Sequence, residues 1–150
     1  MIYLECNPDK ALVSALGIPK NKTIHAYSKG NVCNRLTKCR DSHGLIDEDP
    51  ESSQPSFLRN LENRLRQDDV VLLYHRASNN YLIVLCPRLE EWILEAAKEA
   101  AVDPNKHGLS NEADQLHETI CTRIDNFRRL VDDIKAKSQR MKTLSRFLRA

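Results

Sequence analysis

The sequence predicts an α/β fold in which a mainly parallel sheet is flanked by helices. Short apolar runs with β character alternate with helical patterns from the first residues onward. This alternation favours parallel strands joined by right-handed crossovers. The chain has 150 residues, of which 41% are hydrophobic and 29% charged, so it can build a folded core. Its last forty-one residues contain no Gly or Pro, which is typical of extended helical structure.

The first third of the chain contains three expected strands and two expected helices. Pro8 follows the first apolar run and is well placed at the start of a helix, which Gly17-Ile18-Pro19 ends. The third apolar run leads directly into Asp47-Glu48-Asp49-Pro50. The expected strands are 2–6, 23–27 and 43–46, and the expected helices are 9–16 and 31–39.

The residue pattern in the middle of the chain predicts one helix, a hairpin and a second helix. Ser56 is a plausible N-cap, and the residues after it place apolar side chains at helical spacing. The clearest strands are 70–74 and 81–85, and the short loop 77–80 makes them a hairpin. A helix is expected from Pro87 to Ala101. The apolar stripe of the helix after Ser56 is Phe57, Leu58, Leu61 and Leu65.

The C-terminal residues predict a helical extension of the α/β domain. We place the domain at 1–102 and the extension at 103–150, because Asp103-Pro104 and Gly108 interrupt the preceding helix. The extension is one long helix or two joined by a tight turn. Its apolar stripe must be covered, either by the sheet or by a second copy in a homodimer. The positions expected to be buried are Ile120, Ile124, Phe127, Val131 and Ile134.

Composition excludes several classes of protein. No apolar run approaches the ~20 residues that span a bilayer, and the first residues lack the pattern of a signal peptide. The five cysteines are an odd number at irregular spacing, which argues against a disulfide framework. Glycine-rich motifs for dinucleotides or P-loop nucleotides are lacking. We therefore expect a reduced, cytoplasmic protein.

Charge is distributed unevenly along the chain. Residues 121–150 carry nine Lys and Arg against three Asp and Glu, while the remainder is weakly acidic. A basic segment of this kind fits a protein that meets a polyanion such as nucleic acid, although a solvated helix face is an equally ordinary explanation. The basic residues that we expect to contact nucleic acid are Lys10, Arg128, Arg129, Lys135, Lys137 and Arg140.

Acidic residues follow two of the expected strands. Glu5 closes the first strand, and Asp47 and Asp49 follow the third. Functional residues of parallel α/β sheets collect beyond the carboxyl ends of the strands. Carboxylates are the ligands that Mg²⁺ prefers, together with water and phosphate. The pattern therefore predicts a site for Mg²⁺ or Mn²⁺, although Asp and Pro are also common in turns.

The order and spacing of these acids resemble the Toprim domain of topoisomerases, primases and OLD-family nucleases. The resemblance covers roughly residues 1–86, with its motifs in 4–12 and 44–50. It implies a glutamate that ends the first strand, an aspartate four residues later, and a D-x-D after the third strand, here Glu5, Asp9 and Asp47-Glu48-Asp49. Cys6 departs from the family, which usually has Gly after the glutamate. Cys6 fits only if the backbone there avoids φ > 0.

The direction of the hairpin strands decides whether a third acidic position, Glu90, lies at the same edge as Glu5 and Asp47. Strands joined by four residues are antiparallel, so only one of them runs parallel to the strands that precede Glu5 and Asp47. We choose the second strand, 81–86, which brings Glu90 to the same edge. Leu89-Glu90-Glu91-Trp92 is similar to a motif of small stand-alone Toprim relatives and supports this choice. Acidic residues also suit a first helical turn on general grounds.

The function expected from the resemblance is hydrolysis of nucleic-acid phosphodiesters. Asp47 and Asp49 would hold Mg²⁺ or Mn²⁺, with Glu90 beside them, and Glu5 would bind a second ion or accept a proton from the attacking water. One alternative is a non-catalytic binding or assembly protein, for example in a defence or toxin–antitoxin system. Another is nucleotidyl transfer like that of a primase.

Overall fold

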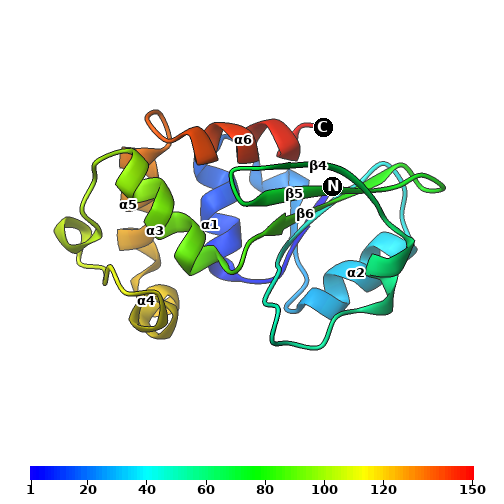
Figure 1. Ribbon diagram of the computed structural model, residues 1–150, viewed down its shortest axis with the longest axis horizontal. Helices are drawn as coiled ribbons and strands as arrows, with labels where there is room; N and C mark the ends of the chain where they lie inside the picture. The colour runs from blue at the N-terminus through cyan, green and yellow to red at the C-terminus, as the bar shows by residue number, and fades with distance from the viewer.

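The structure is a computed structural model that describes residues 1–150, and it has the expected α/β architecture. A six-stranded mixed sheet has the order β2-β1-β3-β6-β5-β4 (Figure 1). The first four strands in this order are parallel, and β5 and β4 continue the sheet antiparallel to them. The strands are β1 (Ile2–Leu4), β2 (Thr23–His25), β3 (His43–Asp47), β4 (Glu62–Gln67), β5 (Val70–His75) and β6 (Asn80–Leu85).

Helices cover both faces of the sheet. The helix α2 packs on one face, and α1, α3, α5 and α6 gather on the other (Figure 1). The helices are α1 (Asn7–Ala15), α2 (Lys29–Thr37), α3 (Leu89–Glu99), α4 (Ala113–Thr119), α5 (Ile124–Ile134) and α6 (Gln139–Leu148).

The hairpin strands run as expected. The strand β6 is parallel to β3, and β5 is antiparallel to β6, with Tyr74 opposite Tyr81. The prediction that the second strand of the hairpin joins the parallel part of the sheet is therefore confirmed. As a result, α3 starts at the same edge as the carboxyl ends of β1 and β3.

The predicted helix after Ser56 is wrong. Ser56–Asn60 forms only a short 3-10 turn, and the following residues form β4 at the edge of the sheet. Asp68 and Asp69 both have positive φ, 54° and 55°, which is the geometry of a tight hairpin turn into β5. Pairing with β5 satisfies the backbone groups of β4 that face β5, and Leu65 stays 43% exposed. Tertiary pairing thus overrides the helical spacing.

The C-terminal segment forms three α-helices, α4, α5 and α6, so the expectation of one long helix or two is wrong; these helices pack on α1, α3 and β5. It breaks at residues 135–138, where Ser138 begins α6 by accepting a hydrogen bond from the Met141 amide. Of the five positions expected to be buried, four are buried and Ile124 is half-buried. These helices share one hydrophobic cluster with strand residues such as Leu4 and Ile83. The stripe that could have paired with a second copy is covered within the chain.

Candidate functional site

Four carboxylates meet at the carboxyl edge of the parallel strands, and we call them the acidic edge: Glu5, Asp9, Asp47 and Glu90. Glu5 follows β1, Asp47 ends β3, and Glu90 lies in the first turn of α3 after β6. Because β1, β3 and β6 are adjacent in the sheet, their carboxyl ends lie side by side. Asp9 joins them from the first turn of α1.

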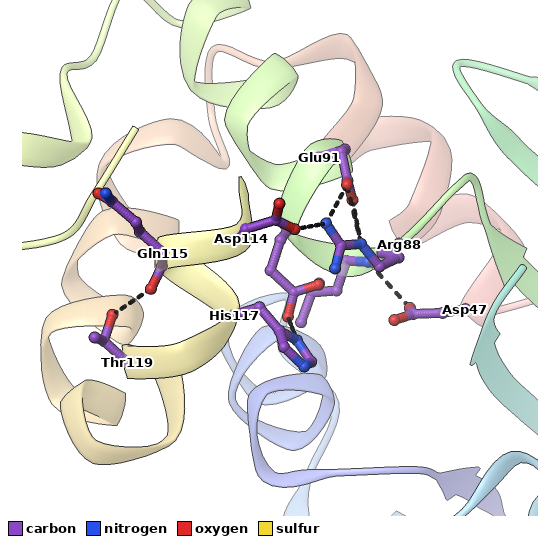
Figure 2. Close-up of polar contacts among 9 residues, drawn as sticks. Asp47, Arg88, Glu91, Asp114, Gln115, His117 and Thr119 are labelled. Carbon is purple, nitrogen blue, oxygen red and sulfur yellow. Dashed lines mark hydrogen bonds and ion pairs between the residues drawn. The ribbon is translucent and has the colours of Figure 1, made fainter. Parts of the chain in front are cut away.

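Backbone hydrogen bonds fix the central carboxylates. The Asp47 amide donates to Glu5 Oε2 at 3.1 Å, and the Leu89 amide donates to Asp47 Oδ1 at 3.1 Å. Asp47 is therefore in direct contact with the residue that follows β1 and with the start of α3. Figure 2 shows Asp47 bonded to the start of that helix.

Asp9 is the most buried member of the acidic edge. It is 1% exposed, and its Oδ2 has no hydrogen-bond partner. The preceding turn is compatible with cysteine, because Cys6 has an extended backbone with φ −146°. The Cys6 in place of the glycine usual in the resembled family is thus accommodated without strain.

Glu90 is bound by a histidine from a distant part of the chain. It is 4% exposed, and its Oε1 lies 2.9 Å from Nδ1 of His117 on α4. Its other oxygen, Oε2, is buried without a partner. The acidic edge therefore contains two buried carboxylate oxygens, on Asp9 and Glu90, whose hydrogen-bonding capacity is unused. A buried polar atom without a hydrogen bond costs folding free energy, so each of these two oxygens calls for a structural or functional explanation.

Burial and mutual repulsion disfavour the charged forms of these acids. Burial, followed by the charges of Asp9 and Glu5, raises the pKa of Asp47 to about 8. Burial and the charge of Glu5 raise the pKa of Asp9 to about 7. Burial also raises the pKa of Glu5, against the opposing effect of the Asp47 amide. Close carboxylates with raised pKa values are the electrostatic signature of a site that attracts cations or protons.

Asp49 lies next to the acidic edge and lines a polar hollow. It has φ 42°, and its amide donates to the Pro87 carbonyl, which attaches the loop after β3 to the loop after β6. The hollow has a volume of about 300 Å³ and also contains Arg88, Glu91 and Asp114. Arg88 is ion-paired with Glu91 and, at 2.9 Å, with Asp114 of α4 (Figure 2). These pairs hold α4 over the start of α3.

The structure adds functional candidates that the sequence did not reveal. Lys29, at the start of α2, donates to the Glu48 carbonyl at 2.8 Å, and its charge partly opposes the burial that raises the pKa of Glu5. The His25 ring is 3.0 Å from the Glu5 carbonyl. No local motif marks Lys29 or His117, because each reaches the edge only through the fold.

The donor set of the acidic edge fits a hard divalent cation. Carboxylate oxygens are the preferred ligands of Mg²⁺ and Mn²⁺, and the unpartnered oxygens of Asp9 and Glu90 offer unused lone pairs. No group of three or more His, Cys, Asp or Glu side chains is already arranged to hold a metal ion. A cation bound here would require the carboxylates to lose protons and draw together, with water completing the coordination.

The basic residues expected to contact nucleic acid are not all at one place. Lys10 and Arg128 line one hollow between α1 and α5, and Lys135 lines a second. Arg140 is instead held by Asp69 at 2.7 Å. Arg129 and Lys137 are exposed outside these hollows.

Together, the fold and the site define an α/β protein with a cluster of carboxylates at the carboxyl edge of its parallel strands. Comparisons with protein-family models, curated proteins and solved structures each found no match to this chain. None of its helices is both long and apolar enough to cross a membrane.

Proposed function

We propose that the protein is a Toprim-like nuclease that hydrolyses nucleic-acid phosphodiesters at the acidic edge with Mg²⁺ or Mn²⁺. The observation that carries the proposal is the pair of buried, unpartnered oxygens of Asp9 and Glu90 within a cluster of four carboxylates. A cation gives these oxygens the partner that the protein itself does not supply. The order of Glu5, Asp9 and Asp47 along the chain, which resembles the Toprim domain, supports the same site.

The residues of the acidic edge divide the chemistry between them. Asp47 and Glu90 would hold the cation, Asp9 would offer its unpartnered oxygen, and Asp49 lies in the adjoining hollow. The bound cation supplies positive charge that offsets the charge developing on the phosphate. Glu5, with Oε2 held by the Asp47 amide, would accept a proton from the attacking water. The water oxygen bonds to phosphorus, the phosphorus–oxygen ester bond breaks, and solvent protonates the departing oxygen.

Cation binding and cleavage can be tested separately. Manganese binding is measured by titration calorimetry, and cleavage by incubating plasmid DNA or single-stranded RNA with Mn²⁺ or Mg²⁺. We expect Asp47→Asn and Glu90→Gln to weaken manganese binding and to abolish cleavage. Glu5→Gln should lower the cleavage rate about 100-fold or more, as loss of a general base does.

A matched control separates the site from general effects of charge. Glu118 is exposed on α4 and has no hydrogen-bond or ion-pair partner, so Glu118→Gln makes the same chemical change outside the acidic edge. It should leave both activities unchanged. Wild-type protein that binds neither cation would refute the site. Cation binding without cleavage of any nucleic acid would instead favour a non-catalytic binding or assembly protein.

A further inference from the structure

Two cation-lined hollows lie at opposite ends of the helix pair α1 and α5. The first, of about 200 Å³, is formed by the early turns of both helices together with Lys20 and Cys121. The second, of about 410 Å³, is formed by their late ends together with α6. Neither hollow is lined by a carboxylate. The cations are Lys10, Lys20 and Arg128 in the first, and Lys135, Lys142, Arg146 and Arg149 in the second.

The two hollows lie along the same pair of helices. Ile124, Arg128 and Lys135 occur at intervals of four and seven residues, so they share one side of α5 and its C-terminal end. Asn7 and Lys10 likewise share one side of α1. We call the two hollows together the basic groove. From Arg128 to Lys135 it extends about 10 Å, the axial length of roughly three nucleotides of a strand.

Several cations of the basic groove have no partner within the chain. The ammonium groups of Lys10, Lys20 and Lys142 make no hydrogen bond or ion pair, although other lysines such as Lys29 make several. Arg128 has only an exposed partner one helical turn away, at 3.7 Å; Lys135 has an exposed partner at 3.1 Å and also donates to the Ala15 carbonyl at 3.2 Å. Exposed pairs of this kind contribute little free energy and are readily exchanged for a phosphate.

The basic groove opens beside the acidic edge. Asn7 and Lys10 of the first hollow flank Asp9, which points the other way into the acidic edge. The hollow and the acidic edge thus lie on two sides of the first turn of α1, and a polyanion in the groove would pass around the start of α1 to meet the carboxylates.

We propose that the basic groove binds the phosphate backbone of a nucleic-acid strand and delivers it to the acidic edge. The choice of nucleic acid rests on the proposed function. An anionic membrane fits less well, because the large exposed hydrophobic side chains are Met1, Tyr27 and Leu65, and none of them lines the groove. Contacts through Lys and Arg to phosphates give affinity without sequence preference and make binding strongly dependent on salt.

The test measures binding in the absence of divalent cations, so that it does not depend on cleavage. Fluorescence anisotropy of a labelled single-stranded DNA is followed at several salt concentrations in EDTA, for wild type and for the variant Lys10→Gln/Arg128→Gln/Lys142→Gln. The variant should lose roughly 10- to 100-fold in affinity, and its salt slope should fall by about 2, because each lost phosphate contact contributes ~0.7 to the slope.

The matched control removes the same charge elsewhere. Arg59→Gln/Lys98→Gln/Lys106→Gln changes three exposed residues outside both hollows and should bind like wild type. Three results would each overturn the proposed role of the groove. They are an equal loss of DNA affinity in both variants, no DNA binding by wild type at low salt, and a preference of wild type for phosphatidylserine vesicles over DNA. If only the groove variant loses binding, the result supports the basic groove. Absence of cleavage would then refute only the proposed hydrolysis, because this assay does not depend on cleavage.

Discussion

Replacing Asp9 by Asn should stabilise the protein at alkaline pH when divalent cations are chelated. Asp9 is buried, has an unpartnered oxygen, and has a pKa raised to about 7 by burial and by the charge of Glu5. A raised pKa means that folding favours the protonated carboxyl. Its stabilising effect is complete below the unfolded pKa near 4 and is lost as the pH rises through about 7.

The magnitude follows from the size of the pKa shift. The pKa of Asp9 rises from 3.8 to about 7, and each unit corresponds to 1.36 kcal/mol, so ionisation of Asp9 costs at most about 4 kcal/mol of stability. Part of this cost is shared with Glu5 and Asp47, whose charges interact with Asp9. About a third of this loss has already occurred at pH 5, so we expect Asp9→Asn to gain about 1–3 kcal/mol relative to wild type between about pH 5 and about pH 9.

Urea unfolding followed by the fluorescence of the buried Trp92 measures this difference. Wild type, Asp9→Asn and the exposed control Glu118→Gln are compared at both pH values in EDTA with reductant. Added Mn²⁺ should raise the stability of wild type at the higher pH and do less for Asp9→Asn, because binding to the folded state stabilises it. The reasoning would be refuted if Asp9→Asn lost as much stability as wild type on raising the pH.

Three further substitutions test the packing that positions the acidic edge, each measured by urea unfolding. Phe127→Ala should cost about 3–5 kcal/mol, because Phe127 is fully buried in the cluster that joins α5 to the sheet; a loss below about 1 kcal/mol would contradict this packing. Gly44→Ala should cost about 1–3 kcal/mol, because the added Cβ would lie 2.7 Å from Val32 Cγ1 and 2.9 Å from Leu82 Cδ1; an unchanged midpoint would show that these side chains move aside easily. Ser138→Ala should cost about 1 kcal/mol or more through loss of the α6 cap and of the bond to Glu99, whereas Ser53→Ala, at an exposed position without side-chain bonds, should cost almost nothing.

The sequence by itself determined the α/β class and the place of the main acidic residues. Alternating strands and helices require parallel strands whose carboxyl ends share an edge, which places Glu5 and Asp47 together. The short hairpin loop requires antiparallel neighbours and leaves two possible places for Glu90. Both inferences depend on local periodicity and loop length, which a single sequence displays directly.

Only the tertiary structure decided how the edge is completed. The segment after Ser56 has helical spacing yet forms β4, because pairing with β5 outweighs local preference. The burial of Asp9, the contact of His117 with Glu90 and the approach of Lys29 depend on helices that are distant in sequence. The basic groove likewise joins residues of α1, α5 and α6. Such contacts are set by packing of the whole chain, so no local pattern specifies them.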